Sequence, residues 1–320
     1  MRSEHSIPPR GTFLQPDEVV RQLRHLPAAA RVLPRLKKLL SDGNSSMHEV
    51  VEMIRLDPGI AARVLQMGNS IYYSRGLHCY TVDEAVDRVG YNQIYELVAN
   101  AVASQVLVRP LTAYGVEADE LWRMSVVCAL AAETLARHLR LERDIAYTVG
   151  LLHGVGLVAI DEWAFRRQPG LRFAAGPLPL ETSEAERAAL GFHNGEAGAA
   201  LLHHWEFSPV MSEPIRWQYH PRGAASHQKF ATVLHLAKRL RSAVCTGALE
   251  ISKTEAGLLD SLGLDGAIFE HLLEKVQAQL QSVRSLLETP SPDRAVLDFP
   301  NGERTIEGSG VTRTLMDRYA

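Results

Sequence analysis

The chain has 320 residues, of which 46% are hydrophobic and 22% charged, a composition typical of a globular protein with one large domain or two smaller ones. Its formal net charge of −3 leaves no basic surplus to neutralise phosphates, so we expect no nucleic-acid partner. The three cysteines are far apart and form no CxxC pair, which argues against a disulfide framework and against a thiolate zinc site.

No segment of the sequence has the character of a targeting or membrane-spanning element. The opening residues, MRSEHSIPPRGTF, lack an apolar stretch that could serve as a signal peptide. No uninterrupted apolar run approaches the roughly 18 residues that a membrane helix needs. We therefore expect a cytoplasmic protein without a membrane partner.

Residues 1–16 are polar and contain three prolines, so we expect a flexible N-terminus. Helical spacing of apolar residues follows, and the helix starts are marked by local signals. Ser45 or Ser46 followed by Glu49, and Thr81 followed by Glu84, have the capping-box spacing. Asp57-Pro58 opens another helix in the same region. These segments predict a helical lobe over residues 17–110.

Longer amphipathic segments fill residues 111–245 and predict a second helical lobe. The segments are "EADELWRMSVVCALAAETLARHL", "RDIAYTVGLLHGVGLVAIDEWAF", "SEAERAALGFHNGEAGAALLHHWEF", "MSEPIRWQYH" and "HQKFATVLHLAKRLRSAV". Two C-terminal helices follow within residues 246–288, and the tail 289–320 loses helical periodicity and should be extended or disordered. The fold class predicted is all-α, a two-lobed helical bundle.

The stretch "LLHGVGLVAI" resembles half of a metal site. A His-Asp pair on one helix, joined by a His from the preceding helix and an Asp from a later one, would hold zinc, iron or manganese. Here Gly154 follows His153, so the bridging carboxylate is absent. A three-histidine zinc site from His153, His193 and His220 is chemically allowed and stays open as an alternative. The Gly154 to Gly156 pair favours close helix packing, and the sequence has neither a GxSxG elbow nor a GxxxxGK loop.

Several motifs taken together resemble the HDOD family, catalytically degenerate relatives of the HD metal-dependent phosphohydrolases. They run from about residue 23 to about residue 244 and include "HLPAAARVLPRLKKLLSD", "EMIRLDPGIAARVLQMGNSIYY", "TVDEAVDRVG", "TVGLLHGVGLVAI" and "VLHLAKRL". The family signature falls on Asp57, Pro58, Asn69 and Ser70. The resemblance implies that the second lobe is HD-like and that the N-terminal lobe packs on it.

The resemblance also implies where a metal centre would have been. Metal-binding HD enzymes carry a His at the position of Met124, a His-Asp pair at His153 and Gly154, and an Asp at the position of Lys238. Three of these four positions are non-ligating here, and an ammonium at Lys238 would repel a divalent cation. We therefore expect no enzyme, no catalytic residue, no bound metal and no cofactor.

The function that follows is a non-catalytic signal-transduction output or scaffold protein of a bacterium. Its expected partners are bacterial signalling proteins of cyclic-di-GMP or two-component pathways, a small regulatory ligand, or a second copy in a homodimer. The alternative is a residual phosphohydrolase or zinc protein that uses His153, His193 and His220.

A ligand pocket could lie between the lobes near the former metal centre. Its candidate residues are Met124, His153, Gly154, His193, His220 and Lys238. Arginines of "FRRQPGLR" (Arg166, Arg167 and Arg172) would suit an anionic ligand if they are not simply solvated. Asn69 and Ser70 are predicted to cap or bridge helices between the lobes, and Tyr72 and Tyr73 to line the same junction.

Overall fold

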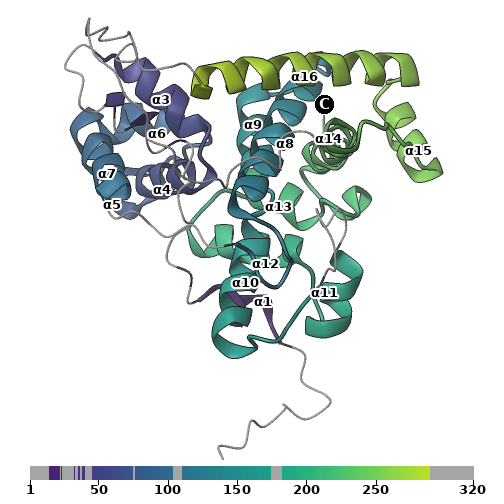
Figure 1. Cartoon of the computed structure of the whole chain (residues 1–320), viewed down its shortest axis with the longest axis horizontal. Coiled ribbons are helices and arrows are strands. Elements are labelled where there is room, and N and C mark those ends of the chain that lie inside the picture. The colour runs from purple at the N-terminus through teal and green to yellow at the C-terminus, as the bar shows by residue number, and fades with distance from the viewer. Residues whose placement is uncertain are drawn as a thin grey trace, which may run out of the picture. The chain divides into compact units, whose positions relative to one another are not determined.

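The computed structural model describes residues 14–21, 23, 32, 35–36, 38–39, 45–74, 76–103, 110–173 and 182–288 (Figure 1). The described residues up to Leu287 belong to one compact unit. Most of the expected flexible N-terminus and the whole 289–320 tail lie outside the described residues.

All regular elements of the described residues are helices, apart from one isolated antiparallel bridge between Leu111 and Val116. The prediction of an all-α fold is therefore confirmed. The core is built mainly from apolar helix faces, and residues between helices such as Tyr114, Phe192 and Phe207 add to it. The buried apolar residues of these helices belong to one continuous cluster.

The N-terminal lobe consists of α3 (Met47–Arg55), α4 (Pro58–Asn69), α5 (Ile71–Ser74), α6 (Val82–Val89) and α7 (Tyr91–Ala103). Ser46 begins α3 and Thr81 begins α6, each through the capping box that the sequence predicted. The Asp57 carboxylate caps α4 by accepting the amides of Gly59 and Ile60 at 2.8 and 2.9 Å. Helix α4 packs mainly on α6.

The first helix, α1 (Pro16–Val20), departs from the predicted lobe boundary. It contacts α10 and α12, which belong to the second lobe. Val19 and Val20 supply its buried face. The predicted 17–110 lobe is therefore corrected at its start, because short-range periodicity says nothing about which distant helices a segment covers.

The second lobe contains α8 (Ala118–His138), α9 (Arg143–Leu152), α10 (Val155–Arg167), α11 (Ser183–Leu190), α12 (Asn194–His204), α13 (Pro209–Arg216), the 3₁₀ turn η1 (Pro221–Gly223) and α14 (Gln228–Thr246). Helix α8 packs along α9 and α14, and α12 packs against α10 and α13. A Cβ added at Gly156 would overlap the Asn194 carbonyl oxygen, so the predicted close helix packing holds at Gly156.

Two segments predicted as single helices are each divided. The apolar run from residue 143 to 165 breaks at His153 and Gly154, which end α9 and begin α10. The run from residue 183 breaks at Gly191, whose φ of 90° is left-handed and therefore favours glycine. His193 then begins α12.

One stretch, Arg143–Arg167, is long and apolar enough to cross a membrane by length and composition alone, which the sequence analysis did not anticipate. Of its most apolar window, 83% is buried inside the protein. The break between α9 and α10 also divides it. Burial of this degree is the pattern of core helices packed on other helices.

Two C-terminal helices, α15 (Lys253–Ser261) and α16 (Gly266–Glu288), lie close to their predicted bounds. Helix α16 buries one stripe at helical spacing, made of Phe269, Leu272, Val276, Leu280 and Val283. The Thr134 hydroxyl of α8 donates to the Gln279 amide oxygen of α16 at 2.8 Å. The predicted C-terminal helical pair is therefore present and packed.

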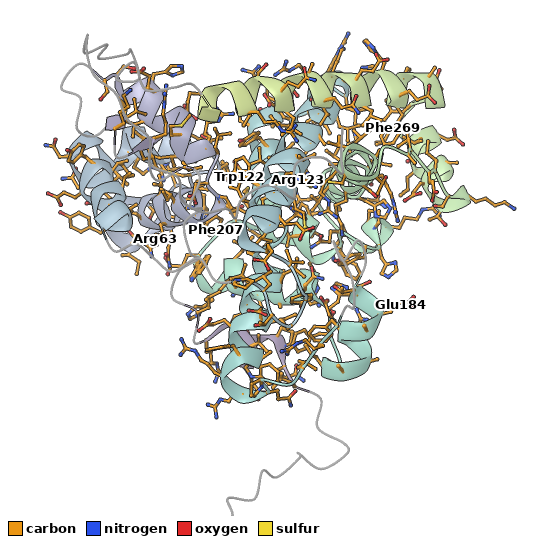
Figure 2. All side chains as sticks on the ribbon, viewed as in Figure 1. Arg63, Trp122, Arg123, Glu184, Phe207 and Phe269 are labelled. Atoms are coloured by element: carbon orange, nitrogen blue, oxygen red, sulfur yellow. The ribbon has the colours of Figure 1, made fainter. Side chains whose placement is uncertain are left out.

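The turn between α3 and α4 accepts two hydrogen bonds that join the two lobes. The Trp122 indole Nε1 donates to the Leu56 carbonyl at 2.8 Å, and the Tyr147 hydroxyl donates to the Arg55 carbonyl at 2.9 Å. Figure 2 places Trp122 where α8 faces the N-terminal lobe. Two successive carbonyls of one lobe are thus held by two helices of the other.

Candidate functional site

His153 ends α9 and is buried, with 3% of its surface exposed. Its Nδ1 lies 2.7 Å from the Gly150 carbonyl oxygen, and its Nε2 lies 2.7 Å from a guanidinium nitrogen of Arg241. A carbonyl can only accept and a guanidinium can only donate. The imidazole is therefore neutral, with its proton on Nδ1 and its Nε2 lone pair held by Arg241.

The surroundings of His153 disfavour its charged form. Burial, followed by the positive charges of Arg241 and Lys238, keeps the pKa of His153 well below its usual value of 6.5. A neutral imidazole is what metal binding requires, but the lone pair that would bind the metal is already used by a cation. This arrangement can stabilise helix packing, whereas metal coordination would first require Arg241 to leave.

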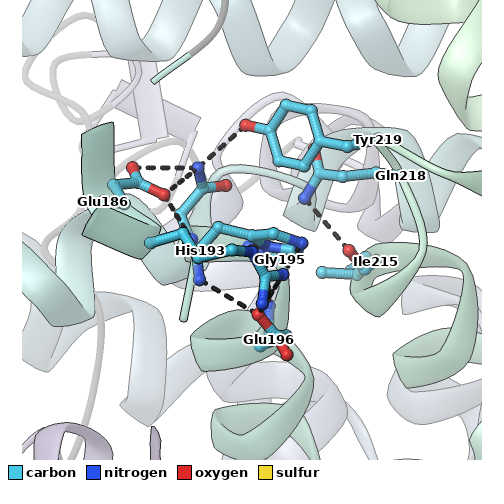
Figure 3. A network of polar contacts seen from close by, with 9 residues as sticks. Glu186, His193, Gly195, Glu196, Ile215, Gln218 and Tyr219 are labelled. Carbon is cyan, nitrogen blue, oxygen red and sulfur yellow. Dashed lines mark hydrogen bonds and ion pairs between the residues drawn. The ribbon is translucent and has the colours of Figure 1, made fainter. Parts of the chain in front are cut away.

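Lys238 lies three residues before Arg241 on α14, and both are buried, with 9% and 3% of their surface exposed. The Lys238 ammonium donates to the Gln218 amide oxygen at 3.0 Å and lies 3.4 Å from the centre of the Tyr219 ring. The amide nitrogen of Gln218 donates to the carbonyls of His153 and Ile215 at 3.2 and 3.1 Å. Lys238 is thus connected to the His153 backbone through the Gln218 side chain. Figure 3 shows Gln218 with its bond to the Ile215 carbonyl.

Arg241 is the functional candidate that sequence reasoning missed. The residue sits in "KRLRSAV", where Lys238 and Arg241 are buried and Arg239 between them is not. Its spacing from Lys238 places both on one face of α14. That spacing was the available signal, since Lys238 was already predicted to lie at the former metal position.

His193 begins α12 and serves as its N-cap. Its Nδ1 accepts the amides of Gly195 and Glu196 at 3.1 and 3.4 Å (Figure 3). Burial lowers the pKa of His193 to about 4, against an opposing attraction from Glu196. Nδ1 can accept these bonds only while it is unprotonated, so the cap requires a neutral ring.

A buried carboxyl group, Glu186, lies beside this helix start. It accepts the backbone amide of Asn194 at 2.5 Å, the side-chain amide of Asn194 at 2.9 Å, and the Thr182 hydroxyl at 2.7 Å. Asn194 also donates to the Tyr219 hydroxyl at 2.8 Å, which links Glu186 to the ring under Lys238. Burial raises the pKa of Glu186, while these donors oppose the rise.

The three histidines of the alternative zinc site are not arranged as ligands. His220 is exposed and begins the turn η1. Both ring nitrogens of His153 are hydrogen-bonded, and Nδ1 of His193 caps α12. Within the described ranges, no group of three or more His, Cys, Asp or Glu side chains is placed to hold a metal ion. Met124 is buried in α8.

Other predicted site residues take local roles. Arg166 pairs with Glu162 at 2.6 Å, Arg172 donates to the carbonyls of Pro169 and Leu171, and Arg167 is exposed. The solvated interpretation of these arginines therefore fits the structure, and a shared anion site with buried Lys238 does not.

The signature amide Asn69 bonds within the N-terminal lobe, contrary to the predicted bridge between lobes. Its side chain pairs with both backbone groups of Cys79, at 3.1 and 2.7 Å. The Ser70 hydroxyl donates to the Met67 carbonyl at 2.7 Å, which ends α4. Tyr72 is exposed and contacts Tyr73 edge-on, so Tyr72 does not line a buried junction.

Comparison with known proteins gives the class and then the family. The structure resembles the MmoQ response regulator of Methylococcus capsulatus, with a TM-score of 0.65, 21% identity, and coverage of 78% of this chain and 98% of that one. It also resembles a virulence factor of Campylobacter jejuni, with a TM-score of 0.59, 19% identity, and coverage of 86% and 98%. These likenesses show a shared all-helical, two-lobed fold.

The HDOD domain family matches residues 26–221, more than half of the chain. The chain therefore belongs to the HDOD family, and the resemblance drawn from its motifs is confirmed. An uncharacterized protein of Treponema pallidum is 23% identical over 202 residues, which cover 61% of this chain. The matched part is 37% of that longer relative.

Proposed function

We propose that this HDOD protein is a non-catalytic signal-transduction or scaffold module of a bacterial cytoplasm. In this proposal Arg241 and Lys238 supply the positive charge at the HD centre and hold its helices together. The observation that carries it is the 2.7 Å bond from Arg241 to His153 Nε2. That bond uses the lone pair through which a metal ion would be bound.

Electrostatics supports the same conclusion. A divalent cation near two buried cations would meet repulsion that water screens poorly. Without a bound ion, a water molecule is seldom activated toward neutral pH, so metal-assisted hydrolysis loses its nucleophile. The hydrogen bonds that already use both ring nitrogens of His153 and Nδ1 of His193 also count against the alternative zinc or phosphohydrolase function.

A role through protein partners is supported by exposed apolar side chains that lie close together in the sequence. Among the described residues, three of the five exposed large apolar side chains lie close in sequence: Ile71, Tyr72 and Leu77, with exposed fractions of 87%, 83% and 69%. Such clusters are typical of protein contact sites. The fold shared with a protein named as a response regulator is consistent with signalling.

The proposal is tested by an assay for hydrolysis. Purified protein is incubated with Mn²⁺, Zn²⁺ or Fe²⁺ and then with bis(p-nitrophenyl) phosphate, beside a His153→Gln variant. We expect the two proteins to release nitrophenol equally and only at the background rate. Metal-dependent release by the native protein that the variant lacks would support the phosphohydrolase alternative instead.

A further inference from the structure

Two small gaps lie between the lobes, one after the other along α9 and α10. The first is lined by Arg55 and the start of α6 in the N-terminal lobe and by α9 in the second lobe. The second is lined by Pro58 and Gly59 at the start of α4 and by residues of α8 to α10. Leu151 borders both gaps, so they are successive parts of one junction.

The gaps make this junction looser than the interior of either lobe. Their volumes are about 10 and 40 Å³, which is room for water and not for an organic ring. Side chains that border a gap lack packing partners on one side, so a movement there breaks few dispersion contacts. Helices touch extensively within each lobe, as α8 does α9 and α4 does α6, whereas α4 and α9 touch across the junction at few positions.

The turn from α3 to α4 connects the two gaps, because Arg55 borders the first and Pro58 the second. The carbonyls of Arg55 and Leu56 in this turn accept the hydrogen bonds from Tyr147 and Trp122 of the other lobe. Two bonds at neighbouring residues fix the position of the turn on the second lobe. They do not fix the angle of the lobe around it.

The Arg55 side chain restrains that angle. Its guanidinium lies 3.4 Å from the Asp83 carboxylate of its own lobe and 3.6 Å from the Asp144 carboxylate of α9. The side chains of Arg55 and Asp144 are 22% and 44% exposed, so their ion pair is largely screened by water and breaks easily. Asp83 still pairs with Arg55 after that break.

We propose that the N-terminal lobe rotates on the second lobe about the α3–α4 turn, and that the ion pair of Arg55 with Asp144 holds one end of this rotation. Rotation that widens the first gap separates Arg55 from Asp144, while Tyr147 and Trp122 keep hold of the turn. The surfaces of the two lobes then change their relative orientation. Binding of a partner to one orientation would shift the population of the other.

Distances between two spin labels, measured by pulsed electron paramagnetic resonance, test the rotation. The labels are placed in full-length protein at Glu96→Cys of α7 and His204→Cys of α12, two exposed positions in different lobes. The background is Cys245→Ser, since Cys79 and Cys128 are buried and Cys245 is not. We expect a distance distribution with two populations.

An aspartate pair tests the role of Arg55. Asp144→Asn removes the ion pair across the first gap and should raise the population with separated Arg55 about twofold to fivefold relative to the other. Asp83→Asn is the matched control, because it removes the partner of Arg55 within the N-terminal lobe and leaves Asp144 in place. This control should not raise that population.

A glycine pair tests the role of the second gap. The φ of −91° and ψ of 2° at Gly154 are accessible to other residues, and an added Cβ would meet only methyl carbons, at 3.6 and 3.9 Å. Gly154→Leu therefore places a side chain in the gap and should leave one narrow population. Gly170→Leu, at an exposed glycine with open space around it, should keep the native distribution.

One narrow population in the native protein, or equal effects of Asp144→Asn and Asp83→Asn, would overturn the proposal. Two populations that Gly154→Leu leaves unchanged would overturn it as well. If Gly154→Leu does not fold, the aspartate pair decides. The rotation goes beyond the proposed function and does not depend on it, because a metal ion found at His153 would refute that function and leave the rotation intact.

Discussion

At His153, the hydrogen bond of Nε2 determines whether this residue can bind a metal ion. Nε2 accepts a hydrogen bond from the Arg241 guanidinium, which uses the lone pair that a metal ion would need, and Nδ1 donates to the Gly150 carbonyl. Replacing a metal ion by a guanidinium preserves positive charge at the imidazole but supplies no Lewis acid. Under the proposed function, His153 therefore keeps a packing role without the chemistry of a metal ion.

Removing the positive charge of Arg241 should make His153 easier to protonate. In Arg241→Met we expect the pKa of His153 to rise, because the variant removes a nearby positive charge while keeping a long side chain. The pKa of His153 is measured by NMR from the pH dependence of its imidazole proton resonances. Arg239→Met is the control, since Arg239 lies on the same helix as Arg241 but pairs with Glu255 of α15. An identical titration in native protein and Arg241→Met would contradict the assigned bond.

His193 should make stability depend on pH. Its pKa is about 4 in the folded protein, below the 6.5 of an unfolded chain, so the unfolded state binds the proton more readily. Its contribution is present in full above pH 6.5 and is lost as pH falls from 6.5 toward 4. The slope from one such group is at most about 1.4 kcal/mol per pH unit.

The variant His193→Asn separates this effect from other titrations, because asparagine also caps helices but does not ionise. Urea unfolding between pH 4.5 and 7.5 should show a shallower slope for it than for native protein. His204→Asn, at the exposed end of the same helix, should keep the native slope. Equal slopes for all three proteins would refute the role of His193.

At the scale of elements, the turn from α3 to α4 shows how the family signature acts. Asp57 holds the start of α4, and the carbonyls of Arg55 and Leu56 just before it accept hydrogen bonds from the other lobe. Arg55 also lies over the Tyr147 ring at 4.9 Å and pairs with Asp83 and Asp144. The capped turn therefore presents two carbonyls in fixed positions.

Trp122→Phe removes one of these two bonds while keeping an aromatic ring. We expect a loss of about 1 to 2 kcal/mol in the free energy of unfolding, since the Leu56 carbonyl loses its donor. Trp205→Phe is the matched control, because Trp205 is equally buried and its indole nitrogen makes no hydrogen bond to other described residues. Urea unfolding compares them, and an equal loss in both would show that ring volume alone matters.

Helix ends with local signals were predictable, and those set by tertiary contacts were not. The spacing of Ser46 and Glu49, and of Thr81 and Glu84, predicted the capping boxes that begin α3 and α6. The break at His153 lies in an apolar, helix-compatible run. The histidine that begins α12, His193, is not among the usual capping residues. The contact of α1 with α10 and α12 is likewise invisible to short-range periodicity.

At the scale of the whole molecule, the family motifs identified the fold and the position of His153 and Lys238. They did not identify Arg241, Gln218 or Glu186, because these side chains meet only after distant helices pack. Nor did they show that Gly154 lines a small, mostly apolar pocket. The sequence therefore did not predict which side chains of distant helices contact one another.

The central claim is that cations, not a metal ion, occupy the former HD centre. Elemental analysis after incubation with zinc, iron and manganese and removal of free ions tests it most directly, with native protein measured beside His153→Gln. The claim predicts no bound metal above background in either protein. Near one metal ion per chain in the native protein, lost in His153→Gln, would contradict it.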